Sequence, residues 1–236
     1  MIPHGDRGKP LQAVLFDVGN TLLHLDYEWL AGLAQALGAG ASPDDVGRAD
    51  ARVRRRGWPE AEEDDRPTAF FPGYFGAVGM EIGLSPADAL AFAASAEREH
   101  LRDQRGIWRS AAPHAAETLQ AIAAQGLRLG VVSNSDGRVE GQLALAGLRA
   151  SFSVVIDSHI AGVEKPDPRI FHAALGALSV APQAALYVGD LWAVDVLGAH
   201  GAGMDGVLYD RWGAYPEIGA ERIRGLRELL LRIRPD

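Results

Sequence analysis

Short apolar segments alternate with helical patterns along most of this chain, and this alternation limits the folds that it can adopt. The apolar segments cover residues 11–17, 127–132, 152–156, 184–188 and 205–209, and the helical patterns between them cover 113–125, 139–146, 168–178 and 195–200. Strands that alternate with helices form a parallel sheet that is covered by helices on both faces. The sequence therefore predicts an α/β fold built on a parallel sheet.

A long helical block interrupts this alternation directly after the first apolar segment. Ser42-Pro43 and Ser85-Pro86 are typical helix starts, because a capping serine precedes a proline at the first helical position. We predict a core formed by residues 1–23 and 106–236, with a helical domain inserted at 24–105. An insert at this point is expected to act as a lid at the strand ends.

The end of the chain carries an apolar stripe that predicts a closing helix. Its members are Ile223, Leu226, Leu229, Leu230 and Ile233.

Composition excludes several classes of function. The net charge is −8 and no basic stripe is present, which argues against a nucleic-acid partner. Cysteine is absent, so disulfides and thiolate metal sites are impossible. The chain has no apolar run long enough for a membrane helix, and its first ten residues lack the apolar segment of a secretion signal. We therefore expect a cytoplasmic protein with no membrane partner.

Polar residues follow the predicted strands where a parallel sheet binds ligands. Asp17, Ser133 and Asp190 each stand at a strand end, and Lys165 lies on the loop after another strand. The carboxyl ends of neighbouring parallel strands line one crevice, so these four side chains are expected to meet. Lys165 is one of two lysines in the chain, the other being Lys9, whereas arginine fills the other cationic positions.

This set of side chains suits phosphoryl chemistry. Asp17 and Asp190 are hard oxygen ligands of the kind that Mg²⁺ prefers. Ser133 and Lys165 offer a hydroxyl group and a compact positive charge to a phosphoryl group. One of the carboxylates could attack phosphorus and form an aspartyl-phosphate.

The chain resembles the haloacid dehalogenase superfamily, which consists mostly of Mg²⁺-dependent phosphatases. The resemblance rests on four segments in the family's order: FDVGNTL (16–22), VVSNSDG (131–137), EKPDPRIF (164–171) and GDLWAVDVLGA (189–199). It implies a Rossmann-like core with a small all-helical cap inserted after the first segment.

The resemblance also assigns roles. It implies that Asp17 is the nucleophile and that Ser133 and Lys165 hold the phosphoryl group. Asp17, the main-chain carbonyl of Gly19 and Asp190 are the implied metal ligands, with Asp195 supporting the metal through water. The predicted substrate-binding residues are Gly19, Asn20, Ser133, Asn134 and Lys165.

Gly19 departs from the pattern of the family's phosphatases, which usually have a second aspartate there as general acid and base. The loss of such a group can reduce the rate by roughly 10²- to 10⁴-fold. His24, Tyr27 and Glu28 are possible substitutes. Dehalogenases of the superfamily also lack this aspartate, but they generally lack the metal-binding Asp of a Gly-Asp pair such as Gly189-Asp190.

We therefore expect a Mg²⁺-dependent hydrolase that acts on a small phosphorylated metabolite. Two alternatives stay open: a catalytically weak phosphate-binding or regulatory protein, and a metal-independent 2-haloacid dehalogenase. A monomer and a homodimer are both compatible with the sequence.

Overall fold

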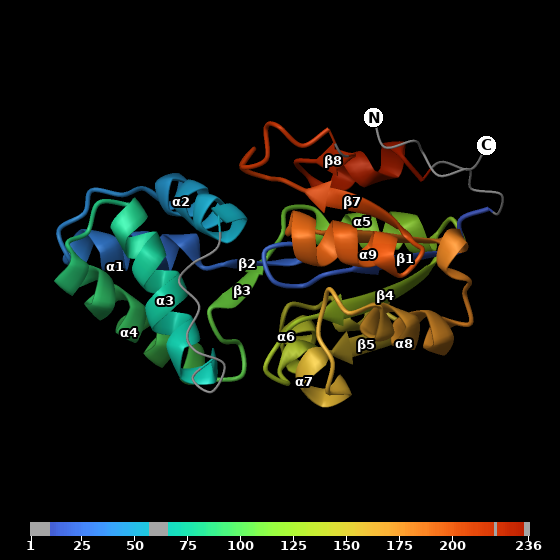
Figure 1. The fold of residues 1–236 in the computed structure, drawn as a ribbon, viewed down its shortest axis with the longest axis horizontal. Helices are drawn as coiled ribbons and strands as arrows, with labels where there is room; N and C mark the ends of the chain where they lie inside the picture. The colour runs from blue at the N-terminus through green and yellow to red at the C-terminus, as the bar shows by residue number, and fades with distance from the viewer. Residues whose placement is uncertain (1–9, 57–65, 220, 234–236) are drawn as a thin grey trace. The chain divides into compact units, whose positions relative to one another are not determined.

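The computed structural model describes residues 10–56, 66–219 and 221–233. Residues 1–9 of the predicted core and 57–65 of the predicted insert lie outside these ranges. The chain divides into two compact units: the described residues up to His24 together with those from Arg109 onward, and the segment Leu25–Trp108. Figure 1 shows the helices and strands of both units.

The first unit is built on a parallel six-stranded sheet of order β5-β4-β1-β6-β7-β8. Its strands are β1 (Ala13–Phe16), β4 (Arg128–Ser133), β5 (Val154–Asp157), β6 (Ala185–Gly189), β7 (Asp205–Tyr209) and β8 (Arg222–Ile223). Every neighbouring pair runs parallel, with Phe16 opposite Val131 on one side and Val188 on the other. The predicted α/β fold with a Rossmann-like parallel sheet is therefore confirmed.

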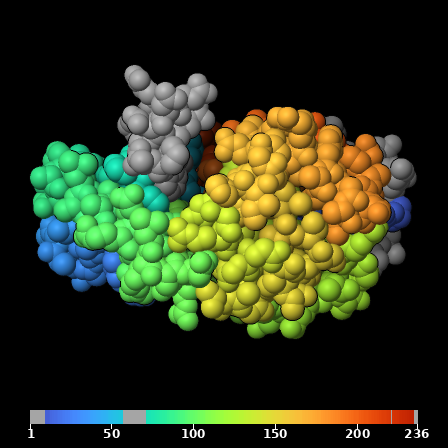
Figure 2. Space-filling view, turned by 90° about the horizontal axis from the view of Figure 1, so that it is seen from below, coloured from blue at the N-terminus to red at the C-terminus, as the bar shows by residue number. Residues whose placement is uncertain are grey.

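Helices cover this sheet on both faces. All residues of β1 are buried, and because alternate residues of a strand point to opposite faces, both faces must be covered. Helices α8 (Pro168–Leu178) and α9 (Leu197–Gly201) pack on one face, and α5 (Ala115–Ala123) lies on the other (Figure 1). The space-filling view shows the segment with β5 and α8, in yellow and gold, over much of the visible face of this unit (Figure 2).

The remaining elements of this unit are short. They are α6 (Val139–Leu145), α7 (Ser158–Ala161), the 3₁₀ turns η2 (Arg149–Ser151) and η3 (Pro182–Ala184), and the π-helical turn η4 (Trp192–Val196). Strands β2 (Leu23–Leu25) and β3 (Trp108–Ala111) form a separate two-stranded sheet where the chain passes from one unit to the other.

The predicted closing helix is confirmed only over Leu226–Leu231, where it is a 3₁₀ helix, and it is wrong at Ile223. Ile223 belongs to β8, where it pairs with Tyr209, and the residues after it form the 3₁₀ helix η5 (Leu226–Leu231). Residues three positions apart lie on the same side of a 3₁₀ helix, so Leu226 and Leu229 are both buried with this geometry. Four of the five stripe residues are buried and Leu230 is partly exposed, but the spacing of the stripe did not distinguish the two kinds of helix.

In the second unit, the described residues form four helices besides their share of β2 and β3. These helices are α1 (Tyr27–Ala36), α2 (Pro43–Arg56), α3 (Arg66–Glu81) and α4 (Pro86–Leu101), which enclose one apolar core. Ser85 caps α4 by accepting a hydrogen bond from the Asp88 N–H, as the sequence predicts. In the parts of the chain that the structure describes, no helix is both long and apolar enough to cross a membrane.

A buried carboxylate ties the helices of this second unit together. Asp50 on α2 is fully buried and accepts hydrogen bonds from the hydroxyl groups of Tyr27 on α1 and Tyr74 on α3. Arg54, one turn further along α2, binds the same carboxylate at 3.0 Å. The charge of Asp50 is therefore compensated inside the unit.

Candidate active site

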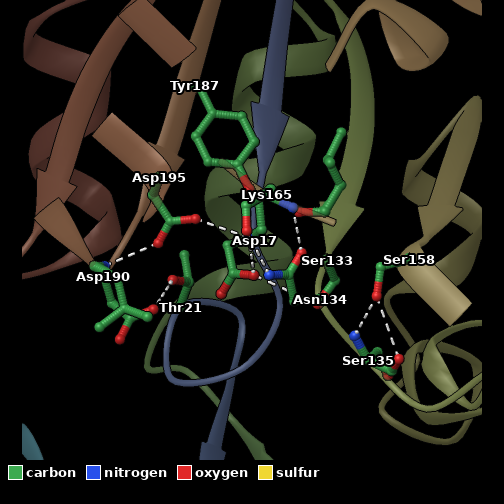
Figure 3. A network of polar contacts seen from close by, with 12 residues as sticks. Asp17, Thr21, Ser133, Asn134, Ser135, Ser158, Lys165, Tyr187, Asp190 and Asp195 are labelled. Atoms are coloured by element: carbon green, nitrogen blue, oxygen red, sulfur yellow. Dashed lines mark hydrogen bonds and ion pairs between the residues drawn. The ribbon is translucent and has the colours of Figure 1, made fainter. Parts of the chain in front are cut away.

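The site lies at the carboxyl ends of β1, β4 and β6, which are adjacent in the sheet. Asp17 directly follows β1, Ser133 is the last residue of β4, and Asp190 directly follows β6. The main-chain N–H of Asp17 donates to the carbonyl of Val188 at 2.9 Å, which fixes the end of β1 against β6. The sheet thus brings together three side chains that are distant in sequence (Figure 3).

Lys165 lies at the centre of this cluster. Its ammonium group is 2.7 Å from Asp17 Oδ1, 2.8 Å from Asp195 Oδ1 and 2.9 Å from the hydroxyl oxygen of Tyr187. An ammonium group has three N–H donors, so each donor has a partner in this arrangement. Lys165 is only 4% exposed, which makes it a buried cation held by two carboxylates.

Ser133 and Asn134 contact this cluster from the end of β4. The hydroxyl of Ser133 donates to Asp17 Oδ1 at 3.4 Å. The side-chain amide of Asn134 binds the main chain of Lys165 twice: it donates to the carbonyl at 2.9 Å and accepts from the N–H at 2.8 Å. Asn134, predicted to bind substrate, thus uses its side chain to hold the loop that carries Lys165.

Asp190 and Asp195 occupy the other side of the cluster. The hydroxyl of Thr21 donates to Asp190 Oδ1 at 3.5 Å. Asp195 accepts from Lys165 with one oxygen and from the N–H of Leu191, at 2.8 Å, with the other.

Gly189 is required by the close approach of Asp195 to the end of β6. A Cβ atom added at this position would lie 2.3 Å from the carboxylate carbon of Asp195, closer than real Cβ contacts. The Gly-Asp pair at the end of β6 therefore serves two purposes: the glycine admits Asp195, and the aspartate delivers its own carboxylate.

The three acids form a donor set that fits a divalent cation. Asp17, Asp190 and Asp195 each offer an oxygen within 4.8 Å of the others, and all three are buried. Lys165 supplies one positive charge against these three carboxylates, so the ionised cluster has an excess of negative charge. Buried charges need compensation, and carboxylate oxygens are the ligands that Mg²⁺ prefers.

Burial and mutual contact shift the pKa values in this cluster. Burial raises the pKa of the Asp17 carboxyl group, the Lys165 ammonium opposes this rise, and the nearby Asp195 adds to it. Burial by itself lowers the pKa of Lys165, but the carboxylates of Asp17 and Asp195 raise it well above its ordinary value. Lys165 therefore stays charged, and further positive charge beside Asp17 would favour its carboxylate form.

Gly19 and Asn20 form the turn that follows Asp17. Asn20 adopts φ 61°, in the left-handed region that asparagine tolerates better than most residues, and its N–H donates to the Leu23 carbonyl at 2.7 Å. Gly19 is partly exposed, and no carboxylate stands at its position.

The candidate substitutes for an acid at position 19 are engaged elsewhere or exposed. Both ring nitrogens of His24 have partners: Nδ1 contacts the Arg211 guanidinium, and Nε2 lies 3.2 Å from the Tyr209 hydroxyl. A guanidinium group only donates, so Nδ1 accepts and the ring is neutral. The Tyr27 hydroxyl donates to Asp50 in the helical unit, and Glu28 is exposed on α1.

Two residues of the cluster, Thr21 and Tyr187, were not among the predicted site residues. Thr21 lies in the segment FDVGNTL, two residues after the turn glycine Gly19, and this position could have marked it as a site residue. Tyr187 stands in the apolar run of β6, where a tyrosine is ordinarily a core residue, so the sequence offered no comparable signal.

Comparison with known proteins identifies the family of this chain. The pattern of the haloacid dehalogenase-like hydrolases matches residues 11–203, and the chain therefore belongs to this family. The resemblance read from the four sequence segments is thereby confirmed.

Curated relatives and solved structures include phosphatases. The chain is 45% identical over 94 residues to human haloacid dehalogenase-like hydrolase domain-containing protein 3, covering 40% of this chain and 38% of that protein. It is 40% identical over 124 residues to a phosphoserine phosphatase of Thermus thermophilus, covering 50% of this chain and 49% of that one. A phosphatase structure of the same superfamily from Thermococcus onnurineus superposes with a TM-score of 0.62 at 27% identity, over 94% of this chain and 98% of that one. The chain thus spans less than half the length of these two curated relatives.

Proposed function

We propose that this protein is a Mg²⁺-dependent phosphatase that hydrolyses a small phosphorylated metabolite through an aspartyl-phosphate on Asp17. The observation that carries the proposal is the buried cluster in which Lys165 contacts both Asp17 and Asp195. The names of the Thermus thermophilus and Thermococcus onnurineus proteins support phosphoester chemistry for this kind of chain.

In this proposal Asp17 and Asp190 hold the metal directly, together with the Gly19 carbonyl. Asp195 supports the metal through water, while its carboxylate oxygens accept hydrogen bonds from Lys165 and from the Leu191 N–H. When bound, Mg²⁺ neutralises charge on the carboxylate and on the phosphate, which otherwise repel each other.

In the first step, Asp17 is the nucleophile and Lys165 and Ser133 stabilise the phosphoryl group. A carboxylate oxygen of Asp17 attacks phosphorus, the ester P–O bond breaks, and its electron pair leaves with the alcohol oxygen. Lys165 and Ser133 turn from Asp17 to the equatorial phosphoryl oxygens, where charge accumulates in the transition state. Water then attacks phosphorus in the aspartyl-phosphate, which releases inorganic phosphate and restores the Asp17 carboxylate.

Protonation of the leaving group is the weak point of this cycle. Gly19 supplies no acid, and the hydroxyl of Tyr27 and both ring nitrogens of His24 have other partners. Leaving groups that depart without a proton, such as aryl oxides, should therefore react faster than alkoxides. We also propose that the parallel-sheet unit is the catalytic core and the helical unit a cap domain that selects the substrate.

A second candidate function follows from the same observation about Gly19. A protein that binds phosphate esters in the cluster but turns them over very slowly would act as a sensor or regulator. The dehalogenase alternative has less support, because Asp190 completes a metal-ligand set that a metal-independent enzyme does not need.

One screen separates these functions. Phosphate release from a panel of phosphorylated metabolites and from p-nitrophenyl phosphate is measured with Mg²⁺ and with EDTA. Binding of inorganic phosphate by calorimetry and halide release from 2-haloacids are measured in parallel. Mg²⁺-dependent phosphate release supports the phosphatase. Phosphate binding without release supports the sensor, and halide release that EDTA does not reduce supports the dehalogenase.

A further inference from the structure

Tyr187 connects the two groups that are proposed to bind the phosphoryl group. It lies on β6, is fully buried, and its ring packs edge-on against Phe171 of α8 at 5.0 Å between centroids. Its hydroxyl group lies 2.7 Å from the Val132 carbonyl and 2.9 Å from Lys165 Nζ. Val132 directly precedes Ser133 on β4, so the hydroxyl joins Lys165 to the strand that carries Ser133 (Figure 3).

The chemistry of the partners fixes the direction of both hydrogen bonds. A carbonyl oxygen only accepts, so the hydroxyl proton of Tyr187 points to Val132. An ammonium group only donates, so Lys165 donates to the hydroxyl oxygen. Burial raises the pKa of Tyr187 well above its ordinary value, although Lys165 opposes this rise, and the hydroxyl keeps its proton.

Tyr187 differs from Asp17, which also contacts Lys165, in how it responds to the proposed reaction. Asp17 changes during the proposed cycle, because the oxygen that contacts Lys165 belongs to the group that attacks phosphorus. Tyr187 is neutral and held by its packed ring and by the Val132 carbonyl, so its contact with Lys165 does not depend on the state of Asp17.

We propose that Tyr187 is a positioning residue, which holds the Lys165 ammonium at a fixed distance from Ser133 while Asp17 exchanges its hydrogen bonds for a bond to phosphorus. This inference rests on the proposed phosphoryl chemistry of the site. A lysine side chain has about 2 kcal/mol of rotamer entropy, which favours many conformations when its contacts are lost. The Tyr187 hydroxyl stays in contact with the ammonium group after the Asp17 contact is lost, and so keeps the cation in place for the transition state.

The test is Tyr187→Phe, which removes the hydroxyl group and keeps the ring. Tyr74→Phe is the matched control, because it removes a buried tyrosine hydroxyl that donates to a carboxylate in the other unit. The substrate is p-nitrophenyl phosphate with Mg²⁺, at a temperature where circular dichroism shows all proteins folded. We expect Tyr187→Phe to lower kcat about tenfold and to weaken competitive inhibition by inorganic phosphate about fivefold, as loss of one hydrogen bond to a charged group implies.

A purely structural role for Tyr187 makes a different prediction. It lowers the melting temperature of both variants and leaves kcat and the inhibition constant of phosphate unchanged in the folded proteins. That result overturns the inference, as does an equal kinetic loss in Tyr74→Phe.

Binding of inorganic phosphate, measured by calorimetry, separates this inference from the proposed function. If the wild-type protein binds phosphate but releases none from esters, turnover is disproved, and weaker phosphate binding by Tyr187→Phe still supports the positioning role. Equal phosphate affinity of the two proteins overturns that role. A wild-type protein that neither releases nor binds phosphate overturns both.

Discussion

The ammonium group of Lys165 lies 2.7 Å from the carboxylate of Asp17, although 148 positions separate the two residues in sequence. The carboxyl end of β1, which carries Asp17, and the loop before α8, which carries Lys165, create this contact. It pairs the chain's one described lysine with the carboxylate at the end of the central strand β1.

The first prediction concerns the loop that carries Lys165. Asn134→Ala removes both hydrogen bonds to the Lys165 main chain, and we expect it to lower the free energy of unfolding by about 1–2 kcal/mol, since the groups left unpaired are only partly buried. The looser lysine should also lower kcat/KM about tenfold. Urea unfolding and phosphate release measure the two effects.

Ser135→Ala is the matched control for this prediction. The Ser135 hydroxyl bonds to Asp136 at the surface, and exposed substitutions of this kind change stability by less than about 0.5 kcal/mol. If Asn134→Ala and Ser135→Ala are equally stable and equally active, Asn134 does not hold Lys165 in solution.

The second prediction concerns the metal. Mg²⁺ at about 100 times its dissociation constant should raise the free energy of unfolding by about 2.7 kcal/mol. Asp190→Asn should lose most of this effect, because it removes one charge of the three-acid set. Thermal unfolding with and without Mg²⁺ measures it, and EDTA should abolish phosphate release.

The exposed Asp44 of α2 provides the control for metal binding. Asp44→Asn makes the same chemical change at the surface and should keep the full response to Mg²⁺. A wild-type protein that Mg²⁺ does not stabilise, or an Asp190→Asn variant that responds as strongly, would contradict the metal site.

The sequence was sufficient to predict the parallel sheet and the meeting of Asp17, Ser133 and Asp190. Each follows or ends an apolar strand, and parallel strands place their carboxyl ends at one edge. The sheet order could not be read from these strands alone, so the contacts of Lys165 with Asp195 and Tyr187 required the structure.

The features that the sequence did not reveal depend on contacts between residues distant in sequence, or on residue types that are common at such positions. Tyr187 has the spacing of a core residue, and only its hydroxyl contacts distinguish it from one. Asn134 is a residue type that is common in turns, and the partner of its side-chain amide, Lys165, is 31 positions away. The kind of closing helix could not be predicted, because buried leucines three positions apart fit both an α-helix and a 3₁₀ helix.

The third prediction concerns the missing acid. Gly19→Asp should raise kcat for alkyl phosphates by about 10²-fold or more, and by less for p-nitrophenyl phosphate, whose leaving group needs no proton. Gly19→Asn has nearly the same shape without the acid and should give no such gain. Initial rates with the two substrates measure the effect. Equal rates in the two variants would show that the absent acid does not limit this protein.

The fourth prediction concerns the helical unit. Asp50→Ala removes the shared acceptor of Tyr27, Tyr74 and Arg54, and leaves a largely buried arginine without this carboxylate. Loss of one partner of a buried ion pair costs about 3–5 kcal/mol. Hydrogen exchange of the amides in α2 and α3 should detect the loss within this unit of the full chain.

Tyr74→Phe removes one donor and leaves the ion pair of Asp50 with Arg54 intact. It should cost about 1 kcal/mol, as deletion of a single hydrogen bond does. If the amides of Asp50→Ala are as well protected from hydrogen exchange as those of Tyr74→Phe, the ion pair of Asp50 with Arg54 does not stabilise this unit.

The nucleophilic role of Asp17 is tested most directly by phosphate release from p-nitrophenyl phosphate with Mg²⁺, compared between the wild-type protein and Asp17→Asn. The asparagine has the same shape but cannot form the aspartyl-phosphate, so the rate should fall by at least about 10³-fold, as expected when a nucleophile is removed. Equal rates in the two proteins, with both folded, would contradict the role of Asp17 and with it the proposed phosphatase.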